Sequence, residues 1–150
     1  MIRTHRLRLT PVTLQNASAL WRVLQAPDLR KYQDLPNVGS AGFDAVVAKR
    51  PHRFQPGSVG RFEWLIYLGR GRKPMGWVSL RTSAREPRSG EIGYSVMRDY
   101  RGRGFAREAV RALVVQGFQE LQLLRISAYF MPENVSSRRL LEHLGFKNGG

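Results

Sequence analysis

Apolar and polar residues follow two different periods at the start of the chain. Arg6-Leu7-Arg8-Leu9-Thr10 alternates polar and apolar positions, which predicts a half-buried strand that Pro11 ends. Beyond it, apolar residues return every three or four positions and predict a helix that Pro27 stops. The residues with this helical spacing are Leu14, Ala17, Leu20, Trp21 and Leu24. The chain therefore begins with a strand followed by an amphipathic helix.

The hydrophobic pattern is weak from Lys31 to Gly60, where several prolines and glycines interrupt it. A short helix is expected over residues 43–49. A segment of this kind suits a loop that faces a substrate, because loops vary most readily and often carry function.

Three strands follow. Residues 62–68 and 75–80 are apolar runs separated by the basic, glycine-bearing segment 69–74, which predicts a β-hairpin. A second loop, residues 84–90, leads into a third strand over residues 91–96.

The last part of the chain alternates between helix and strand. Arg101-Gly102-Arg103-Gly104 opens a helix that extends to Leu121. Residues 124–130 form the next strand, residues 132–134 turn the chain, and a final helix ends at Gly145, a residue suited to a helix C-terminus. The resulting order, β-α-(α)-β-β-β-α-β-α, predicts one α/β domain over residues 1–150, with helices on both faces of its sheet.

Composition narrows the chemistry. The chain has 150 residues and no cysteine, so disulfides, thiolate metal sites and a cysteine nucleophile are excluded. No signal peptide and no apolar run long enough to span a bilayer is present, so we expect a cytoplasmic protein that does not bind membranes. The net charge of +14 favours a phosphate-rich ligand, a nucleic acid or an acidic protein. Dispersed arginines are equally typical of a solvated surface in an arginine-rich protein.

The most informative segment is the loop between the strand at 91–96 and the following helix. A helix N-terminus carries unpaired main-chain amides and a partial positive charge, which suits a phosphate group. Gly102 and Gly104 lack the Cβ atoms that keep a pyrophosphate from those amides, and Arg101 and Arg103 add charged donors. A tight turn that simply needs glycine has the same pattern.

Other nucleotide motifs fit this loop less well. Arg107 stands where the dinucleotide fingerprint requires its third small residue, and no Gly-Lys-Ser/Thr sequence of a nucleoside-triphosphate loop is present. Arginine-glycine dipeptides also occur in RNA-binding tracts, but here strong strand and helix patterns flank them. His5, His52 and His143 lie far apart in the sequence and make no case for a metal site.

Arg101-x-x-Gly104-x-Ala106 resembles the acetyl-coenzyme A signature of the GCN5-related N-acetyltransferase (GNAT) family. Glu91-Ile92-Gly93-Tyr94-Ser95-Val96 is similar to the family's fourth strand. Asn134-x-x-Ser137-x-x-Leu140-Leu141-x-x-Leu144-Gly145-Phe146 is similar to its later motif. The combination resembles the branch that acetylates ribosomal-protein alanine. The resemblance implies a mixed central sheet flanked by helices on both faces.

The resemblance also implies acetyl-coenzyme A as co-substrate and no metal. Main-chain groups near Ser95, Val96 and Met97 would pair with the pantetheine arm, and an amide near Val96 would stabilise the oxyanion. The main-chain amides that would hold the pyrophosphate are those of Arg101, Gly102, Arg103, Gly104, Phe105 and Ala106. An amine would attack the thioester directly, so no enzyme nucleophile is needed.

The resemblance further supplies candidates for proton transfer. Glu91 is the expected general base, acting directly or through water, although a solvated strand-start residue looks the same. Relatives often use a tyrosine at the position of Leu141, and Ser137 is the expected substitute as proton donor to the leaving thiolate. Ser137 equally suits a helix cap, and Asn134 suits either the pantetheine or a cap. Tyr94 and Tyr129 are further aromatic candidates.

The end of the chain departs from the family pattern. The family's sheet continues with one or two strands after the Gly-Phe pair, whereas this chain stops at Gly150. Either the sequence is truncated or the C-terminal strands are missing, and in the second case an open sheet edge is expected. The resemblance to the ribosomal-protein branch makes a protein N-terminus the favoured acceptor. The net charge of +14 agrees with this choice, because it suits work beside ribosomal RNA and repels cationic polyamines. A small-molecule amine and a non-catalytic module that binds acetyl-coenzyme A or RNA are the alternatives. The protein is expected to be a monomer or homodimer.

Overall fold

The predicted strands and helices form in nearly the predicted order. The computed structural model describes residues 1–25, 39–51, 53–128 and 135–147. Their elements are β1 (Ile2–Arg3), β2 (Leu7–Pro11), α1 (Ala17–Leu24), α3 (Ser40–Ala48), β3 (Gly60–Leu68), β4 (Gly76–Thr82), β5 (Ser89–Val96), the 3-10 turn η1 (Arg98–Tyr100), α4 (Phe105–Glu120), β6 (Arg125–Ala128) and α5 (Val135–His143). No helix among these residues is long and apolar enough to cross a membrane.

The strands form one mixed sheet in the order β1-β2-β3-β4-β5-β6. All neighbouring pairs are antiparallel except β5 and β6, which run parallel. Parallel neighbours need a long crossover, and α4 provides it between β5 and β6. At the described edge of the sheet, β6 has β5 as its partner. The predicted mixed sheet is therefore confirmed.

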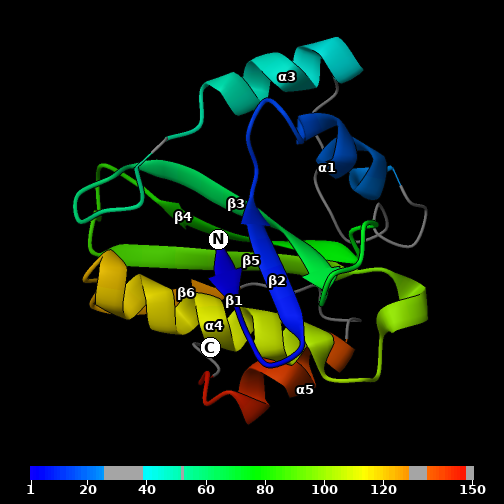
Figure 1. The fold of residues 1–150 in the computed structure, drawn as a ribbon. Helices are drawn as coiled ribbons and strands as arrows, with labels where there is room; N and C mark the ends of the chain where they lie inside the picture. The colour runs from blue at the N-terminus through cyan, green and yellow to red at the C-terminus, as the bar shows by residue number, and fades with distance from the viewer. Residues whose placement is uncertain (26–38, 52, 129–134, 148–150) are drawn as a thin grey trace.

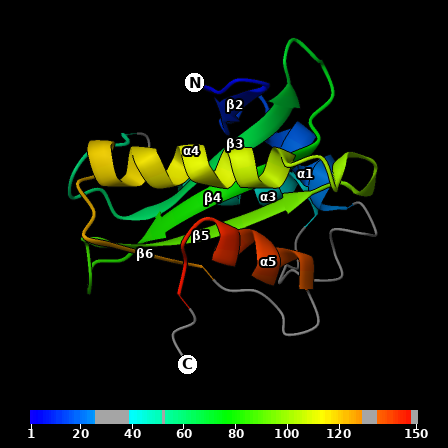
Figure 2. The same ribbon diagram turned by 90° about the horizontal axis from the view of Figure 1, so that it is seen from below.

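Helices cover both faces of the sheet, as predicted (Figure 1). On one face, α1 and α3 pack over Leu65 and Trp77 through Leu20 and Phe43. On the other face, α4 packs over the sheet, and α5 lies beside it across β5 and β6 (Figure 2). The larger core lies under α4, and its fully buried members include Leu9, Ile66, Val78, Leu80, Val110 and Leu113.

The element boundaries differ from the predicted ones at a few positions. Helix α1 begins at Ala17 rather than near Leu14, which is 60% exposed. The side chain of Asn16 accepts a hydrogen bond from the Thr13 amide at 2.7 Å and donates one to the Pro11 carbonyl at 3.0 Å. These bonds hold a turn before the helix, which is how Asn commonly acts at this position.

Other differences are small. Helix α3 begins three residues before its predicted start, and β1 and η1 were not predicted. Strand β6 is described to Ala128; Pro27, the rest of the predicted strand, Tyr129 and the turn at 132–134 lie outside the described residues. Gly145 has φ +92°, and the Phe146 amide donates to the Leu141 carbonyl at 3.0 Å, so the predicted helix end is confirmed.

The packing of α1 and α3 against the sheet can be tested by substitution at Leu65, which lies beneath these helices. Leu65→Ala removes a side chain that has no exposed surface. We expect the free energy of unfolding to fall by about 2–5 kcal/mol. Leu124→Ala changes a side chain that is 73% exposed and should alter stability by less than about 0.5 kcal/mol. Urea unfolding of both variants measures the difference, and equal effects would contradict this packing.

Candidate functional site

The loop between β5 and α4 has the geometry of an anion site. Gly102 and Gly104 adopt left-handed conformations with φ of +79° and +80°, which side chains other than glycine rarely adopt. Gly104 occupies the N-cap position of α4, and no side chain caps this helix end. The glycines are thus required by backbone conformation, and they also leave the main chain accessible.

The first turn of α4 leaves its amides without helical partners. The first helical bond runs from the Glu108 amide to the Gly104 carbonyl at 3.0 Å, so the amides of Phe105, Ala106 and Arg107 precede the helical ladder. The side chain of Phe105 is 5% exposed and packs into the core with that of Ala106. These two residues therefore anchor the helix by their side chains and offer only main-chain groups to a ligand.

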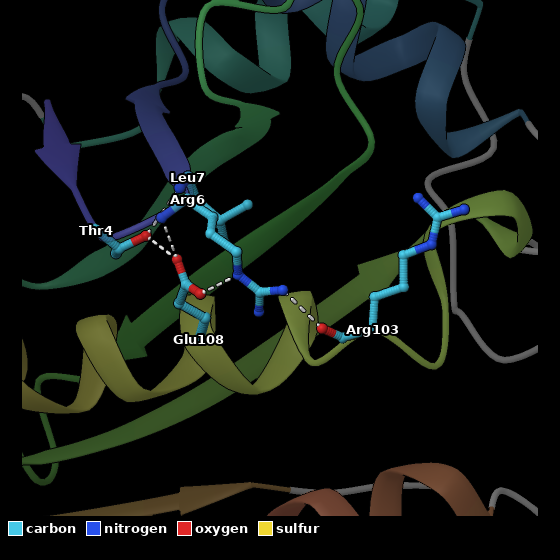
Figure 3. Close-up of polar contacts among 5 residues, drawn as sticks. All are labelled: Thr4, Arg6, Leu7, Arg103 and Glu108. Carbon is cyan, nitrogen blue, oxygen red and sulfur yellow. Dashed lines mark hydrogen bonds and ion pairs between the residues drawn. The ribbon is translucent and has the colours of Figure 1, made fainter.

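An N-terminal cluster holds this helix end in place (Figure 3). The carboxylate of Glu108 accepts hydrogen bonds from the Thr4 hydroxyl and from the main-chain amide and Nε of Arg6, the latter two at 2.8 Å. The Arg6 guanidinium also donates to the Arg103 carbonyl at 2.9 Å and lies 4.4 Å from the centre of the Phe105 ring. Arg6 therefore connects β2 to the glycine loop, a role that sequence reasoning missed.

These contacts change the acidity of Glu108. Partial burial alone raises the pKa of this carboxyl group, but the hydrogen bonds from Thr4 and Arg6 and the charge of Arg6 outweigh it. The net pKa of Glu108 therefore lies below its ordinary value of 4.5. Folding therefore favours the ionised carboxylate. The cluster stabilises the fold fully above about pH 4.5, and this stabilisation is lost as the pH falls through the lowered pKa of Glu108.

Alternation along β5 decides which main-chain groups face a ligand. The Met97 amide donates to the Met75 carbonyl on the β4 side at 2.7 Å, and Ser95, two residues earlier, pairs with Trp77 in the same phase. The main-chain groups of Val96 therefore point to the opposite edge. Described pairing of β5 with β6 ends at Ile92 and Ala128, so Val96 extends beyond the last paired position.

The Val96 carbonyl already has a partner in the protein. It accepts a hydrogen bond from Nε of Arg101 at 2.8 Å. Opposite Val96 on β4 stands Gly76, where a Cβ atom would lie 2.1 Å from the Ser95 carbonyl oxygen. Arg101 and Gly76 thus fix the end of β5, while Ser95 and Met97 bond within the sheet.

The α5 candidates lie on the α4 side of β5. The Tyr94 hydroxyl donates a hydrogen bond to the Ser137 carbonyl at 3.5 Å, and burial raises the pKa of Tyr94. Ser137 is half-buried, and Leu141, at the position of the family's tyrosine, is 4% exposed. The structure thus brings Tyr94 and Ser137 together, while Asn134 lies outside the described residues.

Glu91 lies on the other face of β5. Its carboxylate pairs with the Arg81 guanidinium at 3.1 Å, and its side chain is 38% exposed. Glu91 and Ser95 share this face because side chains alternate along a strand. The predicted base and the predicted proton donor therefore stand on opposite faces of β5.

A cleft of about 540 Å³ opens beside the glycine loop, between α4 and α5. Gly104 lies at one end, and Arg107, Arg111 and His143 are among its lining residues. Within the described ranges, no three His, Asp or Glu side chains lie close enough together to hold a metal ion. Because Arg107 and Arg111 lie on α4 and line this cleft, it continues the cationic surface of the glycine loop along that helix.

The Glu108 cluster gives a pH-dependent prediction. Glu108→Gln should reduce the free energy of unfolding at neutral pH by about 1–3 kcal/mol, since it removes a charged acceptor of several hydrogen bonds. The difference from the unmodified protein should shrink as the pH falls below 4.5, because the native carboxyl then also loses its charge.

Thermal unfolding across pH measures this effect. Glu120→Gln, at the exposed end of the same helix, is the matched control and should show neither change. A stability difference for Glu108→Gln that stays constant down to strongly acidic pH would contradict the assignment.

Comparison with known proteins agrees with this geometry. Residues 6–147 match the family model described as an acetyltransferase (GNAT) domain. The chain is 31% identical over 148 residues to N-acetyltransferase p20 of Bacillus licheniformis, with 98% of this chain and 82% of that protein covered. The ribosomal-protein-S5-alanine acetyltransferase of Vibrio fischeri has a similar fold, with a TM-score of 0.81 and 21% identity over 99% of this chain and 84% of that one.

A further solved structure is RimJ of Mycobacterium smegmatis in complex with CoA-disulfide, with a TM-score of 0.74 and 24% identity over 96% of this chain and 71% of that one. The structural neighbours establish the fold, and the family match extends over nearly the whole chain. The resemblance inferred from the glycine loop and the later motif is confirmed. This chain belongs to the GNAT family and is an N-acetyltransferase.

Proposed function

We propose that this chain transfers the acetyl group of acetyl-coenzyme A to the N-terminal amine of a protein, by direct attack of the amine on the thioester. The observation that carries the proposal is the first turn of α4, where uncapped amides follow two glycines in left-handed conformations. Such a helix end suits a diphosphate, which acetyl-coenzyme A carries.

The cationic groups around the loop suit the same ligand. A side-chain atom at Gly104 would lie 3.3 Å from one guanidinium nitrogen of Arg6 and 3.7 Å from one of Arg107, so two cations face the space above this glycine. The pyrophosphate would rest there on the amides of Phe105, Ala106 and Arg107. The cleft lined by Arg107, Arg111 and His143 would receive the nucleotide end.

The outer edge of β5 would bind the pantetheine arm. The main-chain groups of Val96 face this edge. Those of Ser95 and Met97 point the other way, toward β4, where the Met97 amide is hydrogen-bonded. We therefore assign the main-chain pairing and the oxyanion contact to Val96. An amide fixed in a strand stabilises developing negative charge without having to reorganise during the reaction.

Proton transfer would use both faces of β5. Glu91 is five positions from Val96, a Cα separation of about 17 Å along a strand, so it would take the amine's proton through water. On the other face, Ser137 would protonate the leaving thiolate, and Tyr94 holds the α5 backbone at that point.

The acceptor assignment rests on similarity and charge. Two solved structures of the same fold are described as ribosomal-protein alanine and serine acetyltransferases. The net charge of +14 disfavours polycationic amines and favours acidic or ribosomal surroundings. Turnover of peptides with a free N-terminus, compared with a panel of small amines, tests this assignment; exclusive turnover of small amines would contradict it.

The diphosphate site gives a binding prediction. Gly104→Asp should abolish measurable binding of acetyl-coenzyme A in calorimetry, because the new carboxylate would pair with Arg6 and Arg107 and repel the phosphates. Gly57→Asp is the matched control, since Gly57 is exposed, has φ +86° and lies outside the site. Equal affinity in both variants would show that the loop assignment is wrong.

The base gives a kinetic prediction. Glu91→Gln should lower kcat by about 10²-fold or more and move the pH optimum upward, because the amine must then lose its proton to solution. Glu86→Gln, in the exposed loop before β5, should leave the pH–rate profile unchanged. A profile that Glu91→Gln does not alter would remove this residue from the mechanism.

A further inference from the structure

Charged residues gather on the face of the sheet that α1 and α3 cover. They lie away from the Val96 end of β5, where the thioester is proposed to bind. The strand register places Arg61, Arg81 and Glu91 in one row across β3, β4 and β5. Glu63 and Ser79 lie in the next row, and Leu65 and Trp77, which α1 and α3 cover, lie in the third. The charged row therefore lies beyond the edge of the helix-covered core.

A pocket of about 350 Å³ adjoins this row, where the end of α3 meets the start of β3. Its lining includes three cationic residues, Lys49, Arg50 and Arg61. Arg50 is paired with the buried carboxylate of Glu63 at 3.0 Å. The pocket thus holds more positive charge than the carboxylates of the described residues neutralise.

Arg61 is a cation of this pocket that has no paired carboxylate among the described residues. It is half-buried, and no carboxylate among the described residues lies within ion-pair distance of its guanidinium. Burial lowers the pKa of Arg61, while the more distant carboxylates of Glu63 and Glu91 act to raise it. Because a guanidinium stays charged in proteins, an external anion is what would complete this pocket.

Partly exposed residues lie along β5 between the row of Arg61 and the Val96 end of the strand. Ser95, Gly93 and Glu91 are each half-buried along this face of β5, and Arg81 beside Glu91 has 52% of its side chain exposed. Five residues along β5 and two strands across give about 19 Å between the backbones at Val96 and Arg61. An extended peptide covers this distance in about five or six residues.

We propose that the pocket of Lys49, Arg50 and Arg61 binds the carboxylate of an acidic side chain at about the fourth to sixth position of the acceptor polypeptide. The inference rests on the proposed function, since it takes a protein N-terminus as acceptor. It names the acceptor class more narrowly, as N-termini with early Asp or Glu residues. A carboxylate forms charge-assisted, bidentate bonds with a guanidinium, which gives such a contact selectivity.

Paired peptides test the proposal directly. Two acceptor peptides with free N-termini differ only in carrying Asp or Asn at positions 4 to 6. The Asp peptide should have a KM about tenfold lower or more, with similar kcat. Arg61→Gln should reduce this preference to less than about twofold, whereas Arg85→Gln, an exposed arginine in the loop before β5, should retain it. Equal KM values for the two peptides, or an undiminished preference in Arg61→Gln, would overturn the inference.

Two measurements distinguish failure of the pocket proposal from misfolding of the variant and from failure of the proposed function. Unchanged acetyl-coenzyme A affinity in Arg61→Gln shows that the variant folds and keeps its co-substrate site. The Asp peptide with a blocked N-terminus cannot react, so its binding is measured by titration even where no peptide is turned over. If the unmodified protein binds this peptide and Arg61→Gln does not, the pocket assignment is supported. If the unmodified protein does not bind the peptide, the inference is overturned. RNA binding that Arg61→Gln abolishes, without any effect of the Asp peptide, assigns the pocket to nucleic acid and overturns the inference.

Discussion

The carboxylate of Glu108 joins two segments that are about a hundred residues apart in the chain. It accepts hydrogen bonds from Thr4 and Arg6, and Arg6 in turn holds the Arg103 carbonyl and covers the Phe105 ring. Arg101 fixes the strand side of the glycine loop through its hydrogen bond to the Val96 carbonyl, and Arg6 fixes the helix side through the Arg103 carbonyl. A preformed anion site at α4 therefore depends on this contact with the N-terminal strand.

The second constraint is the phase of β5. Because main-chain groups alternate between the two sides of a strand, one bond from the Met97 amide to Met75 turns Val96 toward the outer edge. The same alternation places Glu91 on one face and Tyr94 on the other. A single strand thus separates the acceptor side of the proposed site from the α5 side, and it joins both to the loop that opens α4.

Local patterns predicted the elements well because each one depends on nearby residues. The helix predicted to open at the glycine loop forms as α4, the alternation in β2 is confirmed, and the Gly102 and Gly104 conformations agree with the predicted loop. The start of α1 was wrong, because Asn16 bonds backward to residues 11 and 13 and delays the helix. This start is readable in the sequence once Asn16, a residue type common at the N-cap position, is considered as the boundary in place of Leu14.

Long-range contacts left no such signal. Nothing in the spacing of Arg6 and Glu108 indicates that they meet, and the register that turns Val96 outward depends on how β4 pairs with β5. The buried pair of Arg50 and Glu63 is equally invisible to periodicity, since Glu63 occupies a strand position that resembles any polar one. The roles of Glu91 and Ser137 came from family resemblance, and they stay predictions.

The central claim is that main-chain amides at the start of α4 bind the diphosphate of the thioester carrier. A crystal structure with coenzyme A bound tests it most directly. The account predicts phosphate oxygens within hydrogen-bond distance of the amides of residues 105–107, with the pantetheine arm along the Val96 edge of β5. Coenzyme A bound at another surface, with this helix end in contact only with solvent, would contradict it.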